Sequence, residues 1–97
     1  MPTYIGLLRY TEQGIKAIKD SPKRREAAAK AIASLGGKLV HSYLTLGRYD
    51  VVAIIEAPDD EAAAKFALMT GAQGNLSTET MRAFTEAELD RLIESLP

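Results

Sequence analysis

Near its centre the chain reads Leu44-Thr45-Leu46-Gly47-Arg48-Tyr49-Asp50-Val51-Val52-Ala53-Ile54-Ile55, a short turn between two strand-like runs. The runs are rich in β-branched and aromatic residues, which suit the pleated surface of a sheet. We expect Gly47 to supply the positive φ that a tight reversal needs. The stretch therefore predicts a central β-hairpin, and the remaining segments are placed by asking what covers it.

Strand-like and helix-like segments alternate on both sides of this hairpin. Alternating apolar patterns predict strands, whereas Ala-rich runs that begin with Ser-Pro or Pro-Asp-Asp and end in glycine predict helices. We expect strands at residues 3–10, 38–46, 51–57 and 77–84, and helices at residues 11–18, 21–35 and 61–70. A capping box that begins at Thr85 and a helical-period apolar stripe predict one more short helix at the end of the chain.

The order of these elements predicts an α+β fold. Strand, helix, two-strand hairpin, helix and strand form the ferredoxin-like βαββαβ arrangement, here as a single domain over residues 1–97 with an extra C-terminal helix. Right-handed crossovers place both main helices on one face of a four-stranded antiparallel sheet. The other sheet face is then open.

We expect the open face to be too apolar to stay in water. The residues assigned to it by alternation are Tyr4, Leu8, Tyr10, Leu39, His41, Tyr43, Thr78, Thr80, Arg82 and Phe84. An exposed apolar patch of this kind indicates a partner or a ligand. The expected architecture is a homodimer or larger oligomer that closes sheet against sheet.

Composition narrows the possible partners and the compartment. The 97 residues carry a formal net charge of −1 and contain no Cys. The balanced charge argues against nucleic acid as a partner, and the absence of Cys excludes disulfides and thiolate chemistry. No apolar run is long enough to span a membrane and no signal peptide is visible, so we expect no membrane association and a cytoplasmic location.

A few polar side chains on the predicted open face are candidates for chemistry. His41, the only histidine, could act as a general base, could bind haem axially, or could be a hydrogen-bonded interface residue. Arg82 could hold an anionic ligand or form an ion pair. The expected ligand-binding residues are Arg82, His41, Tyr43, Tyr4 and Thr80.

Two other polar groups have both structural and functional interpretations. The cluster Lys23-Arg24-Arg25 could bind an anion at the start of a helix or could be a solvated face. Asp50 could accept hydrogen bonds from turn N–H groups or could accept a proton, and Tyr49 could pack across the hairpin. Metal-ligand spacing and glycine-rich phosphate loops are absent, so we expect no metal and no cofactor.

Several of these stretches together resemble the GYD-domain family, small proteins named for a Gly-Tyr-Asp motif and largely without assigned function. In this chain Arg48 separates Gly47 from Tyr49 and Asp50, which form the motif. The other matching stretches are residues 10–14, 19–24, 36–37, 56–60 and 78–84. The resemblance implies a ferredoxin-like fold and kinship with dimeric α/β-barrel proteins, which include cofactor-independent oxygenases and ligand-binding modules.

Two functions follow as expectations. The first is a homo-oligomeric module that binds a small molecule at the open sheet face, which the lack of an acid–base constellation favours. The alternative is a cofactor-independent oxygenase-like enzyme with His41 as base and with Arg82 and Tyr43 orienting the substrate. A regulatory trimer of the same topology ranks last, because the turn at 46–50 is too short to reach a target.

Overall fold

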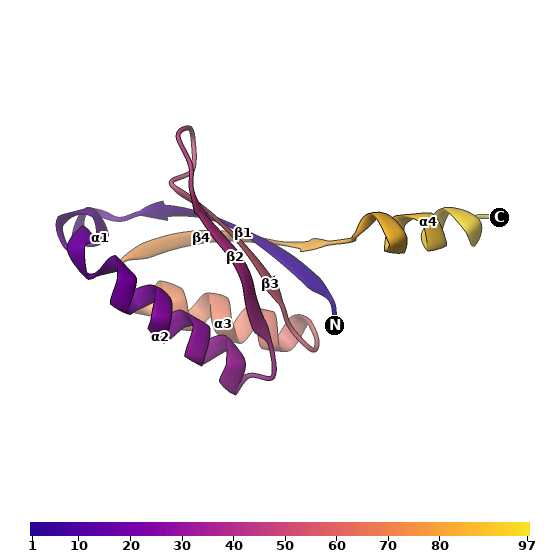
Figure 1. The fold of residues 1–97 in the computed structure, drawn as a ribbon, viewed down its shortest axis with the longest axis horizontal. Coiled ribbons are helices and arrows are strands. Elements are labelled where there is room, and N and C mark those ends of the chain that lie inside the picture. Colours follow the sequence, from indigo (N-terminus) through magenta and orange to yellow (C-terminus); the bar gives the residue numbers. More distant parts are fainter.

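In the computed structural model, which describes residues 1–97, two long helices cover one face of a four-stranded antiparallel sheet (Figure 1). The sheet order is β2-β3-β1-β4, which is the predicted ferredoxin-like order. The elements are β1 (Thr3–Tyr10), α1 (Glu12–Lys16), a 3-10 turn (Ile18–Asp20), α2 (Ser21–Ser34), β2 (Lys38–Leu44), β3 (Val51–Glu56), α3 (Asp60–Ala72), β4 (Leu76–Ala83) and α4 (Glu86–Glu94).

The two central strands, β1 and β3, carry apolar residues on both faces. Ile5 in β1 is paired with Ile54 in β3 on one side and with Met81 in β4 on the other. The preceding residue, Tyr4, is paired with Ile55 and points the opposite way. Double-sided apolar character is typical of strands that need cover on both faces.

The core lies between α2, α3 and one end of the sheet. It contains Tyr4, Ile32, Ile55, Ala57, Ala62 and Ala63. Ile32 of α2 is fully buried, and the small alanines of α3 let that helix approach the sheet closely. This cluster fixes which sheet face the helices cover.

The predicted assignment of residues to the open face is wrong for β1 and β4. Tyr4 and Leu8 are buried on the helix-covered face, and the cross-strand register places their β4 partners on that face too. The residues so relocated are Tyr4, Leu8, Tyr10, Thr78, Thr80 and Arg82. Alternation groups side chains correctly, but both groups in β1 are apolar, so it does not tell which group the helices cover.

In β2 a bulge separates residues that strict alternation places together. Leu39 is paired with Ile55 and His41 with Ile54, so Val40 is the extra residue. Leu39 therefore packs against the core on the helix side, while His41 and Tyr43 lie on the open face. The open face comprises Ile5, Leu7, His41, Tyr43, Val52, Ile54, Glu79 and Met81.

Local signals at the element ends are mostly as expected. Thr11 caps α1, Asp59 caps α3, and Gly36 ends α2 with a φ of 83°. Gly47 is an exception, because its φ is not positive. The β2–β3 connection is closed by a hydrogen bond between Thr45 and Asp50, so it is longer than the tight turn predicted and does not need a left-handed residue.

The chain exposes more surface than a compact monomer of its mass. Its accessible area is 6605 Å² for 10.5 kDa, whereas the usual scaling gives about 5,400 Å². Its radius of gyration is 14.5 Å, against about 12.5 Å for a compact chain of this length. Part of the excess is α4, which extends away from the sheet and helices (Figure 1).

Candidate functional site

The Gly-Arg-Tyr-Asp loop joins the hairpin to the central strand β1. The backbone N–H of Asp50 donates to the carbonyl of Leu8 at 2.9 Å, and the N–H of Tyr10 donates to Asp50 Oδ2 at 2.9 Å. Within the loop, Thr45 Oγ1 donates to the carbonyl of Tyr49 at 2.6 Å. Asp50 thus continues the β1–β3 ladder beyond the last paired residues, which favours the structural interpretation of this carboxylate.

Tyr49 crosses the end of β1 on the open face. Its hydroxyl donates to the carboxylate of Glu79 on β4, and this hydrogen bond raises the pKa of Tyr49 above its ordinary value. The guanidinium carbon of Arg9 lies 4.9 Å from the centroid of the Tyr49 ring, and Arg9 Nε donates to the carbonyl of Arg48 at 2.9 Å. The motif loop, which leads into β3, is therefore linked to β1 and β4 by exposed polar contacts.

At the opposite end of β1, Tyr4 forms a buried contact with α3. Its hydroxyl donates to Asp60 Oδ1 at 2.5 Å. Burial away from water, reinforced by this hydrogen bond, raises the pKa of Tyr4 to about 12. Tyr4 is therefore a neutral donor at ordinary pH, and it ties β1 to the first turn of α3.

Arg82 lies where β4 leads into α4. Its guanidinium carbon is 4.3 Å from the Phe84 ring centroid and 5.7 Å from that of Tyr4, and one nitrogen lies 4.0 Å from Glu88 Oε2. The backbone N–H of Thr85 donates to Glu88, which lowers the pKa of that carboxyl. Arg82 thus has an intrachain carboxylate partner.

The structure separates the residues predicted to bind a ligand. Arg82 lies beside Tyr4 on the helix-covered face. Thr80 lies on the same face, two residues before Arg82 in β4, and the Thr80 hydroxyl is 3.1 Å from the Thr78 hydroxyl. His41 and Tyr43 lie together on the open face, with ring centroids 5.7 Å apart. A ligand at the open face would meet His41 and Tyr43 but not the other three.

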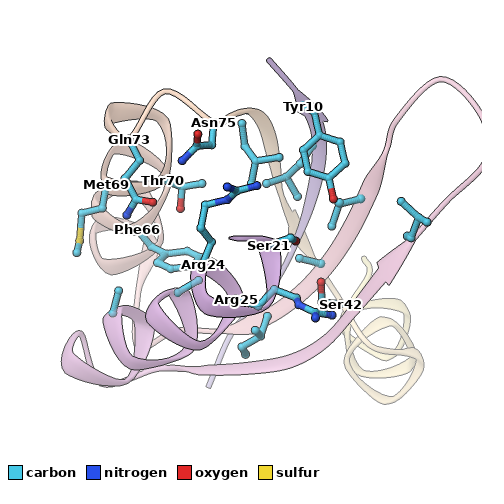
Figure 2. Close-up of a pocket in the computed structure, with 18 of the residues that line it drawn as sticks. Tyr10, Ser21, Arg24, Arg25, Ser42, Phe66, Met69, Thr70, Gln73 and Asn75 are labelled. Atoms are coloured by element: carbon cyan, nitrogen blue, oxygen red, sulfur yellow. The ribbon is translucent and has the colours of Figure 1, made fainter. Parts of the chain in front are cut away.

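A cavity of about 160 Å³ lies on the helix side, between α2, α3 and the sheet. It is at the far end from the core, where α2 begins and α3 ends. Its lining is Leu8, Tyr10, Ser21, Arg24, Arg25, Ala28, Ala31, Leu39, Ser42, Tyr43, Leu44, Val51, Ala53, Phe66, Met69, Thr70, Gln73, Asn75 and Leu76. Figure 2 shows the side chains of Arg24 and Arg25 extending from α2 among these residues.

The cavity was not predicted from the sequence, although one feature that helps to form it, the alanine content of α2, is visible there. Ala28 and Ala31 belong to the Ala-rich run that predicts the helix at residues 21–35, and their short side chains leave room beneath α2. No sequence pattern indicates that the polar residues Ser42, Gln73 and Asn75 line the cavity, because the β2 bulge and the end of α3 bring them there.

Two kinds of feature are absent from the structure. No group of three or more His, Cys, Asp or Glu side chains is arranged to hold a metal ion. No helix combines the length and the hydropathy required of a membrane span.

Comparison with known proteins gives a family, a curated relative and a solved structure. The GYD domain matches residues 4–93. A Thermus thermophilus protein named "glutamine synthetase and cystathionine beta-lyase binding protein" is 32% identical over 90 residues, which is 92% of this chain and 95% of that protein. A crystal structure of a protein from the same organism superposes with a TM-score of 0.51 at 27% identity, covering 88% of this chain and 95% of the other.

Proposed function

Because the chain belongs to the GYD-domain family, whose relative above is named as a binding protein, we propose that it is a non-catalytic homodimeric module that docks onto a metabolic enzyme. Glutamine synthetase and cystathionine β-lyase are the first enzymes to test, by analogy with that relative's name. The proposal places this module in the cytoplasm. The observation that carries the proposal is the large apolar surface that the chain leaves uncovered.

The proposed dimer closes the open sheet face of one chain against that of a second copy. The chain exposes about 1,200 Å² more than a compact monomer of its mass, part of it on the extended α4, and a standard interface buries about 800 Å² per partner. The open face offers a continuous apolar strip centred on Ile5, Ile54 and Met81. A second copy presents the same strip, so the contact is self-complementary and of the dimeric α/β-barrel type.

The proposed enzyme contact is the apolar stripe of α4 together with Leu96, just after its end. Leu89, Leu92, Ile93 and Leu96 are 49%, 46%, 54% and 68% exposed. An amphipathic helix with this stripe fits an apolar groove. Glu86, Asp90 and Glu94, spaced four residues apart, form an acidic row along one flank of this stripe, so the proposed groove on the enzyme has a basic rim.

Two substitutions separate these contacts. Met81→Glu introduces a charge into the open face at an exposed position of β4 and is expected to shift the dimer toward monomer. Leu92→Glu in α4 is expected to abolish enzyme binding and to leave the dimer intact. Sedimentation velocity reads the first effect, and surface plasmon resonance against each purified enzyme reads the second. Absence of binding to both enzymes at about 10 μM, a concentration at which docking contacts of this kind are measurable, would overturn the docking proposal.

The oxygenase-like alternative has less support. His41 stacks on Tyr43 in an exposed position, and no carboxylate is hydrogen-bonded to it to orient the imidazole as a base. Arg82, the proposed substrate-orienting residue, lies on the other sheet face beside Tyr4. A small molecule bound at the open face would therefore be held by His41 and Tyr43 at the dimer interface.

A further inference from the structure

We infer that the cavity between α2 and α3 is a binding site for a small apolar carboxylic acid, with the carboxylate at Arg24 and Arg25 and the apolar body beneath the helices. This inference goes beyond the proposed function, because the cavity lies on the helix-covered face of the sheet, away from α4, and shares only Tyr43 with the open face of the proposed dimer contact. Either property can be present without the other.

The charge at the cavity is entirely positive. Arg24 and Arg25 are the ionisable cations among the lining residues, and the lining contains no Asp or Glu. Neither arginine takes part in an ion pair within the chain. A half-buried guanidinium without a counter-ion, as at Arg24, favours an anion from outside.

Arg24 is held in place by backbone acceptors. Its Nη1 donates to the carbonyl of Ala17 at 2.9 Å and its Nη2 to the carbonyl of Gly14 at 3.4 Å. These bonds fix the side chain over the cavity while leaving its net charge uncompensated. A guanidinium pre-oriented in this way loses little conformational entropy when it binds a carboxylate.

Below the arginines the cavity is lined mainly by apolar groups. Leu8 and Leu76 come from the sheet, Phe66 from α3, and Ala28 and Ala31 from α2. The volume of about 160 Å³ is close to that of an apolar cavity that binds a single aromatic ring. The body of the ligand is therefore expected to be one ring or a short aliphatic chain.

Hydroxyl and amide groups at the edge of the cavity supply further hydrogen bonds. Tyr10, Ser21 and Ser42 lie with the arginines in Figure 2, and Asn75 lies just beyond the end of α3. An apolar lining with a few convergent polar groups is typical of small-molecule sites. The arrangement discriminates between an acid and its uncharged analogue through the two arginines alone.

The test titrates the full chain with phenylacetate and, as its neutral counterpart, phenylacetamide, and follows backbone amide shifts by NMR. Phenylacetate is expected to give saturable shifts at Leu8, Phe66 and Leu76. Phenylacetamide is expected to bind at least about tenfold more weakly, the difference expected for a charge-assisted hydrogen bond. Equal affinity for the two probes, or no saturable shift up to about 10 mM phenylacetate, would overturn the inference.

Three variants localise the binding. Arg24→Gln is expected to weaken phenylacetate binding about tenfold or more, and Ala28→Leu, which fills the cavity, is expected to abolish it. Ala27→Leu places the same side chain at an exposed neighbouring position of α2 and is the matched control. If Arg24→Gln fails to fold, Arg25→Gln replaces it. Unchanged phenylacetate affinity in a folded Ala28→Leu variant would contradict the site.

Discussion

Replacing Asp50 by alanine is expected to destabilise the chain by about 1 to 3 kcal/mol. In the structure Asp50 Oδ2 accepts the backbone N–H of Tyr10 at 2.9 Å in a half-buried position. Alanine leaves that N–H without its acceptor, and the loss of a partner for a partly buried donor costs about this much. The bond from the Asp50 N–H to the Leu8 carbonyl remains, because it belongs to the backbone.

Urea unfolding followed by far-UV circular dichroism measures this effect. For a chain of this size the slope in urea is about 1 to 3 kcal/mol/M, so a loss of about 2 kcal/mol lowers the midpoint by roughly 1 M. All variants are compared at one protein concentration, because the proposed dimerisation would couple stability to concentration. Asp50→Asn keeps a side-chain oxygen acceptor and is expected to lose less than Asp50→Ala.

The control is Asp90→Ala, which removes an exposed carboxylate from α4. Its stability is expected to stay within the range typical of surface substitutions, about 0.5 kcal/mol. If Asp50→Ala were as stable as Asp90→Ala, the structural role assigned to the motif aspartate would be refuted, and proton acceptance by Asp50 would regain support.

Three further outcomes follow from particular contacts. Gly14→Ala is expected to destabilise the folded chain by at least about 1 to 3 kcal/mol, because a Cβ at this position meets the backbone carbonyl of Asn75. Gly47→Ala is the control and is expected to be nearly neutral, because its Cβ meets nothing within 4 Å. Equal urea midpoints for the two variants would contradict this difference. The pKa of Tyr4 is about 12 in the folded chain against an ordinary value of 10.0, so its contribution to stability is complete below pH 10.0 and is lost as the pH rises toward 12. Urea midpoints measured across this range are expected to fall more steeply for the native chain than for Tyr4→Phe, and parallel curves would argue against the buried hydrogen bond. Tyr49→Phe removes an exposed hydrogen bond to Glu79 and is expected to cost less than about 1 kcal/mol in urea unfolding; a loss as large as that of Asp50→Ala would show that the contact is stronger than its exposure indicates.

The fold was predictable from the sequence because its signals are local and agree with one another. The Thr11, Asp59 and Thr85 caps and the Gly36 stop place helix ends within a few residues. The order of the elements then leaves few topologies. Ser21 begins α2 as the Ser-Pro pair predicts, although Asp20 before it makes no side-chain cap.

The candidate site was less predictable, for two physical reasons. The identity of the covered sheet face depends on contacts between Tyr4, Ile32 and Ile55, which are far apart in sequence. The bulge at Val40 reverses the phase of β2 and separates Leu39 from His41, and no residue type marks it. The cavity likewise depends on how α2 and α3 pack over the sheet. The alanines of these helices permit that packing but do not determine it.

Native mass spectrometry of the purified chain tests the central claim, that a second copy covers the open sheet face. If a second copy covers this face, the spectrum shows a species of twice the 10.5 kDa chain mass, which Met81→Glu converts to monomer and Leu92→Glu leaves unchanged. A native chain that remains a 10.5 kDa monomer at about 50 μM, where a stable dimer of standard interface size is formed, would contradict it.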